Sequence, residues 1–111
     1  MDSYKFPERD WKLLRRIQGK ALTEACKQVF LEVEKISEDR TGREHEAYLE
    51  MRDLIKEKDR EIANTFNNVR RSNAIYGLIN MVAYGYLSEE QLAGFTEETQ
   101  EKVLFITNNR K

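Results

Sequence analysis

Residues that could support catalysis are few in this chain of 111 residues. His45 is the only histidine and Cys26 the only cysteine, so the sequence can assemble neither a multi-histidine metal site nor an intrachain disulfide. A nucleophilic triad would also lack a second candidate base. His45 lies among Arg43, Glu44 and Glu46, which is typical of a solvated surface residue. We therefore predict no catalytic residue and no metal ligand.

Carboxylate pairs and glycines lead to the same expectation. Pairs such as Glu57 with Glu61 have helical spacing, whereas the acids of a glycosidase must face one cleft, so a charged helix surface is the favoured interpretation. The five glycines are scattered, and neither G-x-x-x-x-G-K-S nor G-x-G-x-x-G occurs. We predict no cofactor and no enzymatic activity.

Cys26 lies four residues from both Leu22 and Phe30. This helical spacing favours a small buried hydrophobic residue, because a reactive thiol would need an exposed, electropositive site.

Composition limits the classes of partner. Lys and Arg number 19 against 20 acids, giving a net charge of −1, and a chain without excess positive charge is not expected to bind nucleic acid. The longest uncharged stretch, 72–88, is shorter than the ~20 apolar residues of a membrane span. The first residues, MDSYKFPERDW, lack the pattern of a secretory signal. We expect a cytoplasmic protein, and the sequence leaves open secretion without such a signal.

Apolar periodicity predicts helices throughout and no strand. Pro7, followed by Glu8 and Asp10, is a typical helix start, and apolar residues three or four apart extend this helix to about Ser37. Thr41 with Glu44 has the form of a capping box for a second helix that runs to about Asn68. The polar cluster of Asn64, Thr65, Asn67 and Asn68 leaves a bend, a break or a weak stretch as alternatives.

The remaining residues predict a small helical head. The run 72–87 is apolar almost all round and ends near Gly85, which suits a buried helix. Ser88 with Gln91 marks a short helical turn, and Thr96 marks the start of a final helix. One domain should span residues 1–111. Its expected core includes Trp11, Ile62, Phe66 and Leu78.

The first helix carries more apolar surface than one antiparallel neighbour can cover. A second apolar line borders the main apolar stripe of this helix. The second line consists of Leu13, Ile17, Leu22, Cys26 and Phe30. A helix of ~30 residues is also ~45 Å long, so the shape should be elongated. We expect a two-fold dimer to bury the excess.

A group of mixed charges marks the middle of the second helix. Its members are Arg52, Asp53, Lys56, Lys58, Asp59 and Arg60. One interpretation is a solvated face held by pairs one turn apart, such as Asp53 with Lys56 or Glu57 with Arg60. The other is a face that binds a partner.

Two segments resemble the cyanobacterial fluorescence recovery protein family. They are MRDLIKEKDREI and RRSNAIYGLINMVAYGYLSEEQLAGF, within a match that covers roughly 49–104. The resemblance implies an elongated all-helical dimer with a long hairpin and a small head. It also implies a protein that is not an enzyme but binds the orange carotenoid protein and speeds its return to the resting state.

The resemblance also implies a functional patch on the second helix. Asp53 matches the family's aspartate, Leu49 stands where the family has a tryptophan, and the family's arginine falls at Asp59, beside Arg60. Because two of the three positions differ, the partner of this chain is expected to be another protein.

The sequence therefore predicts an all-α, dimeric regulator that binds one specific protein, such as a bacterial effector enzyme, and inhibits it. Two alternatives remain: a photoprotection regulator that binds the orange carotenoid protein, and a structural coiled-coil assembly protein. The partner-binding residues are predicted to be Leu49, Arg52, Asp53, Lys56, Asp59 and Arg60. A second location for the site is the head around Tyr84, Tyr86 and Phe95.

Overall fold

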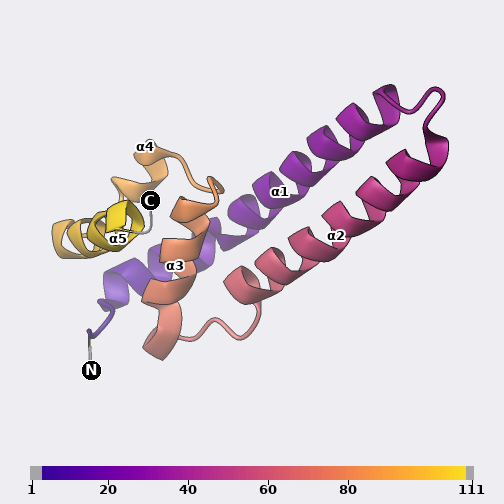
Figure 1. Ribbon diagram of the computed structural model, residues 1–111. Coiled ribbons are helices and arrows are strands. Elements are labelled where there is room, and N and C mark those ends of the chain that lie inside the picture. Colours follow the sequence, from indigo (N-terminus) through magenta and orange to yellow (C-terminus); the bar gives the residue numbers. More distant parts are fainter. Residues whose placement is uncertain (1–3, 110–111) are drawn as a thin grey trace.

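Two long antiparallel helices form a hairpin, and shorter helices pack at one end of it (Figure 1). The computed structural model describes residues 4–109. The hairpin consists of α1 (Glu8–Glu38) and α2 (Glu44–Phe66). The molecule measures 53 × 27 × 25 Å, so the predicted all-helical, extended architecture is confirmed. The described residues contain no strand.

The bounds of α1 agree with the prediction from Pro7 and from the apolar spacing. Pro7 precedes the first helical residue, and its carbonyl accepts the first helical bond from Trp11 N at 2.9 Å. Glu8 and Asp10 lie in the first turn, near the positive end of the helix dipole. The helix ends where Asp39 N donates to Lys35 O.

The turn between the long helices corrects one prediction. Thr41 does not cap α2; the N-cap is Arg43, and no side chain makes the capping hydrogen bond. The Glu44 carboxylate instead accepts a bond from Gly42 N at 3.4 Å. Gly42 has φ +83°, a left-handed conformation that glycine adopts without steric cost, and this geometry replaces the capping box.

The second helix breaks before the head. α2 ends at Phe66, two residues earlier than predicted, and Asn68 adopts φ +59°. The Asn73 side chain holds the break, because it donates to Asn68 O and accepts from Arg70 N. A 3-10 turn, η1 (Arg71–Asn73), then leads into α3 (Ala74–Ala83). The regular helix is therefore shorter than the predicted 72–87.

α3 ends close to Gly85, as the sequence predicted for the buried helix. Tyr86 N donates to Met81 O and Gly85 N donates to Val82 O, with Gly85 at φ +76°; this is the Schellman pattern. The predicted capping box at Ser88 and Gln91 opens α4 (Glu89–Leu92). The last helix is α5 (Glu97–Asn109). We call η1 and α3–α5 the head.

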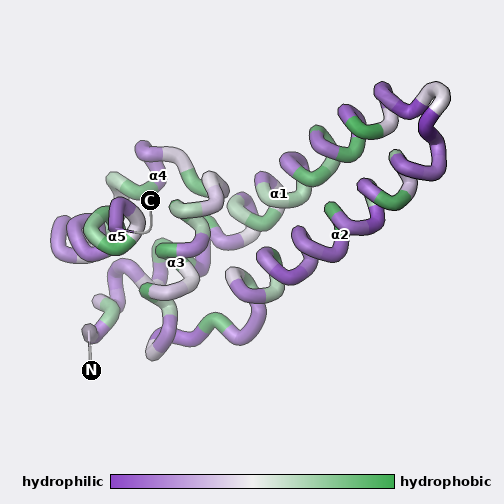
Figure 2. Tube along the Cα trace, in the orientation of Figure 1, coloured by the Kyte–Doolittle hydropathy of each residue, from purple (hydrophilic) through white to green (hydrophobic). Residues whose placement is uncertain are grey.

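The core lies where the head meets the first half of α1. Its largest fully buried apolar side chains are Leu14, Leu78, Ile79, Met81 and Val103. Figure 2 shows α3 as mainly hydrophobic, whereas α2 is largely hydrophilic. Of the four residues predicted for the core, Leu78 is fully buried, but Trp11, Ile62 and Phe66 are only half-buried at its edge.

The helices of the described residues do not reach the combined length and hydropathy that crossing a bilayer would require.

Candidate functional site

The predicted partner-binding residues lie on the face of α2 that points away from α1. Buried Ala47 and Thr65 mark the contact side of α2, with half-buried Met51, Leu54 and Lys58 between them. At 3.6 residues per turn, the predicted residues fall on the opposite side. All are exposed except Leu49, which is half-buried. We call these six residues, Leu49, Arg52, Asp53, Lys56, Asp59 and Arg60, the α2 patch.

The charges of the α2 patch are mostly free of ion pairs. The pairs expected one turn apart are not formed: Asp53 is bound by its neighbour Arg52, with 3.0 Å between Arg52 Nη2 and Asp53 Oδ1. Lys56, Asp59 and Arg60 form no ion pair with the residues that the structure describes. Their charges remain available to solvent or to a partner.

Lys58, from the same run of charges, behaves differently. Its ammonium Nζ lies 3.3 Å from Glu61 Oε2 and 3.8 Å from Glu32 Oε2 on α1. Partial desolvation alone would lower the pKa of Lys58, but Glu61, Glu32 and Glu57 together raise it. Lys58 therefore joins the two helices and is not part of the α2 patch.

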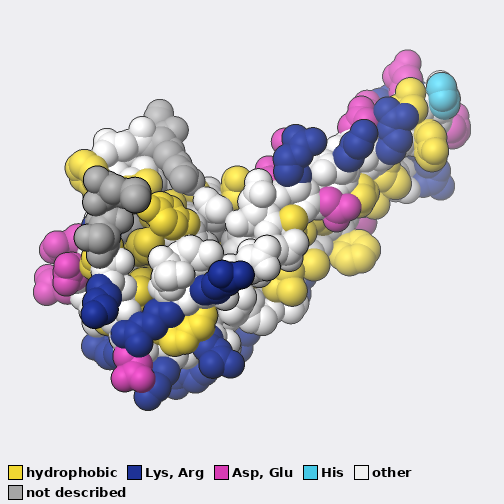
Figure 3. All heavy atoms as spheres, turned by 90° about the horizontal axis from the view of Figure 1, so that it is seen from below, with side chains coloured by type: hydrophobic (Ala, Val, Ile, Leu, Met, Phe, Trp, Pro, Cys, Tyr) yellow, Lys and Arg dark blue, Asp and Glu magenta, His cyan; other side chains and the backbone are white. Residues whose placement is uncertain are grey.

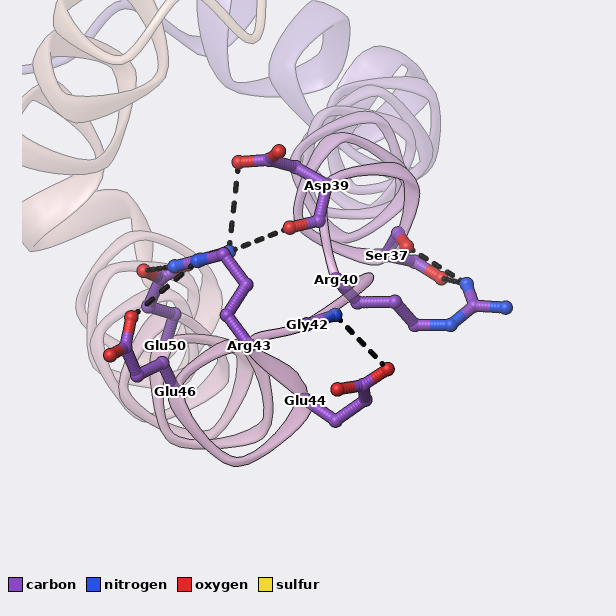
Figure 4. A network of polar contacts seen from close by, with 8 residues as sticks. All are labelled: Ser37, Asp39, Arg40, Gly42, Arg43, Glu44, Glu46 and Glu50. Carbon is purple, nitrogen blue, oxygen red and sulfur yellow. Dashed lines mark hydrogen bonds and ion pairs between the residues drawn. The ribbon is translucent and has the colours of Figure 1, made fainter.

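A second charged group closes the tip of the hairpin (Figure 4). The Arg43 guanidinium forms ion pairs with Asp39, Glu46 and Glu50. Desolvation acts to lower the pKa of Arg43, but the three carboxylates, Glu50 above all, raise it. Arg43 is therefore engaged within the chain, and it fastens the turn to the first two turns of α2.

The alternative location in the head is wrong for two of its three residues. Tyr86 and Phe95 are buried, at 4% and 2% exposure, so neither offers a contact surface. Burial and nearby Glu61 raise the pKa of Tyr86 to about 12. Only Tyr84 is exposed.

Cys26 belongs to an exposed apolar surface of the hairpin. This residue is exposed, not buried as its spacing predicted. It lies between Leu22, at 38% exposure, and Phe30, at 66%. On α2, Tyr48 and Ile55 are also exposed, at 63% and 41%. Figure 3 shows hydrophobic side chains along the hairpin on the face that it draws.

Helical geometry places these residues on one side of the hairpin. Each follows by one position a residue that is buried or half-buried at the contact between α1 and α2: Ala21, Ala25 and Val29 on α1, and Ala47 and Leu54 on α2. Each step of one residue rotates the side-chain direction by ~100° about the helix axis, with the same handedness in both helices. Because α1 and α2 are antiparallel, the residues one step after the contact residues point to the same side of the hairpin. We call Leu22, Cys26, Phe30, Tyr48 and Ile55 the apolar flank.

The opposite side of the hairpin is polar and is attached to the head. Gln28 Nε2 donates to Gly85 O at 2.9 Å, and Tyr86 Oη lies 3.5 Å from Glu61 Oε2. Gln28 and Glu61 precede the contact residues Val29 and Ile62, so they lie on the side away from the apolar flank. The head therefore leaves the apolar flank uncovered.

Asp10 is a structural residue whose role the sequence did not reveal. Its carboxylate is fully buried and accepts bonds from Thr96 N, Thr96 Oγ1 and Thr99 Oγ1 at 2.9, 2.7 and 2.6 Å. Tyr4 Oη also lies 2.5 Å from Thr99 Oγ1. Asp10 therefore holds the start of α5 from a position on α1.

The residues considered for catalysis do not come together. His45 is exposed and stacks on Tyr48 with ring centroids 6.5 Å apart. Within residues 4–109, no three His, Cys, Asp or Glu side chains are grouped so that they could hold a metal ion.

Comparisons of the chain with protein families, with curated proteins and with solved structures gave no match. The resemblance to the fluorescence recovery protein family therefore stays a prediction from the sequence.

Proposed function

We propose that this protein is a non-enzymatic dimeric regulator that binds one specific protein partner and inhibits it. The partner, of which a bacterial effector enzyme is an example, binds the α2 patch. Two copies associate through the apolar flank.

The observation that carries the proposal is the division of the hairpin into separate faces. The apolar flank exposes Leu22, Phe30, Tyr48 and Ile55 on one side, and contiguous exposed apolar surface marks sites of protein association. A second copy can cover it by a two-fold contact, in which the same surface meets itself. Leu49, Asp53, Lys56 and Arg60 of the α2 patch point in another direction, so the dimer leaves them free. Arg52 and Asp59 lie one turn after Tyr48 and Ile55 and border the apolar flank.

The free charges of the α2 patch are suited to recognition and contribute little to folding. Exposed pairs such as Arg52 with Asp53 are worth only ~0–1 kcal/mol. Truncating or reversing a charged side chain that is desolvated and paired in a complex can weaken the free energy of binding by ~2–5 kcal/mol. Charge reversal in the patch should therefore separate binding from folding.

The experiment compares the parent with two charge-neutral double variants as baits in source-cell lysate. Asp53→Arg with Arg60→Glu changes the α2 patch, and Glu34→Arg with Lys35→Glu makes the same exchange at exposed positions of α1. Parent and control should capture the same protein, and the patch variant should capture at least tenfold less. The purified regulator should then lower the activity of the captured protein.

The α2 patch would not be the partner-binding site if its variant captured as much of the same protein as the parent while retaining helicity and mass. Capture with no effect on the activity of the captured protein would favour a structural assembly role instead of regulation. Capture of an orange carotenoid protein would favour the photoprotection alternative.

A further inference from the structure

Five cations form a line along the first two-thirds of α1. They occur at intervals of three, four, four and seven residues, which places them on the face of α1 that points away from α2. The line extends over about 27 Å, from ~1.5 Å per residue. All five are exposed, and we call them the basic stripe: Arg9, Lys12, Arg16, Lys20 and Lys27.

The stripe is not neutralised by the chain's own acids. None of its members forms an ion pair with a residue in 4–109. Only Arg9 has a hydrogen-bond partner there, the Gly94 carbonyl at 3.4 Å. The same chain surrounds Arg43 with three carboxylates, whereas the acids nearest the stripe, Glu8 and Glu24, form no ion pair with it.

The arrangement works against helix stability. Lys12 lies one turn from both Arg9 and Arg16, and Lys20 lies one turn beyond Arg16, and like charges at this spacing repel. Arg9 and Lys12 also lie near the positive end of the helix dipole, which disfavours cations. Glu8 lies one turn from Lys12, and Glu24 lies one turn from both Lys20 and Lys27, so these acids offset part of the repulsion. The only charged residues at that spacing from Arg16 are cations.

The surface around the stripe is hollowed in two places. Near the start of α1, Arg9, Lys12, Arg15 and Arg16 line one hollow together with Glu8. Farther along, a hollow of about 530 Å³ lies between α1 and the residues after α3, lined by Lys20, Thr23, Lys27, Ser88 and Gln91 among others. Glu24 also lines it, with one oxygen held by Gln28 Nε2 at 3.4 Å. Both hollows can admit anionic groups beside the cations.

We propose that the basic stripe binds an acidic segment of a protein, one rich in Asp or Glu. Charge complementarity supports this class of ligand. Nucleic acid fits less well, because the chain's net charge is −1 and gives no overall attraction to phosphates. The stripe is on α1 and is separate from the α2 patch, so the proposal goes beyond the function given above.

The test uses the full chain and a labelled poly-L-glutamate of about 20 residues, with a 20-base-pair DNA duplex as the competing probe. Lys12→Glu, Arg16→Glu and Lys20→Glu together reverse the middle of the stripe. The matched control, Arg52→Glu with Lys56→Glu and Arg60→Glu, changes the net charge equally on α2. Poly-glutamate should bind the parent, more weakly as salt is added. The stripe variant should lose at least tenfold in affinity and the control less than threefold.

Three results would overturn the proposal. An equal loss in both triple variants would show an effect of net charge only. Tighter binding of the duplex than of poly-glutamate would assign the stripe to nucleic acid. No binding of poly-glutamate at low salt would also contradict it. The milder variant Lys12→Gln with Arg16→Gln controls for misfolding. It should weaken the binding of poly-glutamate but leave the melting temperature unchanged or higher, because it relieves repulsion between the cations.

Discussion

A buried carboxylate on α1 connects the beginning of the chain to its end. Asp10 was expected in the first turn of a helix, where an acid favours the dipole, and it does lie there. Its side chain, however, accepts the bonds of Thr96 and Thr99. The sequence shows a helix start at Thr96 but not that its capping acid lies 86 residues earlier. Such a pairing depends on how the head packs on α1.

Asp10→Ala should destabilise the fold by about 2–3 kcal/mol, because it leaves buried donors without the charged acceptor that they share. Glu8→Ala is the control: Glu8 lies in the same turn but is exposed, and its loss should change stability by no more than about 0.5 kcal/mol. Urea unfolding of both variants measures the difference. Equal midpoints would show that the Asp10 network adds nothing to stability.

At the scale of helices and turns, local signals predicted most bounds. Pro7 and the capping box at Ser88 and Gln91 fix helix starts through their own backbone neighbours, so the pattern is visible in the sequence. The break after α2 was one of three alternatives, because the positive φ of Asn68 is stabilised by Asn73 five residues away. The expected box at Thr41 failed because Gly42 redirects the backbone.

Gly85→Ala should cost about 1–2 kcal/mol, because φ +76° is unfavourable for residues with a Cβ. The new Cβ would meet no atom within 4 Å, so the cost comes from the backbone conformation. Gly85→Asn should cost less, since asparagine tolerates this region better. Thermal unfolding of the two variants tests the order. The same loss in both would argue against a backbone origin.

At the scale of the whole molecule, the sequence predicted an uncovered apolar line on α1 but not the apolar residues that α2 leaves exposed. Leu22, Cys26 and Phe30 of that line are exposed, whereas Leu13 and Ile17 pack half-buried against the core. The spacing of Tyr48 and Ile55 indicates a helix face equally well whether the head, α1 or a second copy covers it. The head attaches through Gln28 and Tyr86 on the polar side, so the apolar flank stays exposed. The helical spacing was sufficient to predict where the α2 patch lies. Locating the apolar flank also required knowing that α1 and α2 run antiparallel.

The proposed association of two copies through the apolar flank can be tested at Phe30, for which the chain offers a closely matched control. Phe30 and Leu31 are adjacent, apolar and similarly exposed, at 66% and 57%, but a step of ~100° turns Leu31 away from the flank. Phe30→Asp should therefore disrupt the dimer, and Leu31→Asp should leave it intact.

Sedimentation equilibrium at low micromolar concentration measures this directly. We expect twice the chain mass of 13.2 kDa for the parent and for Leu31→Asp. For Phe30→Asp we expect a single chain mass, with helicity retained. A parent of one chain mass, or dimers of equal affinity in both variants, would contradict association through the apolar flank.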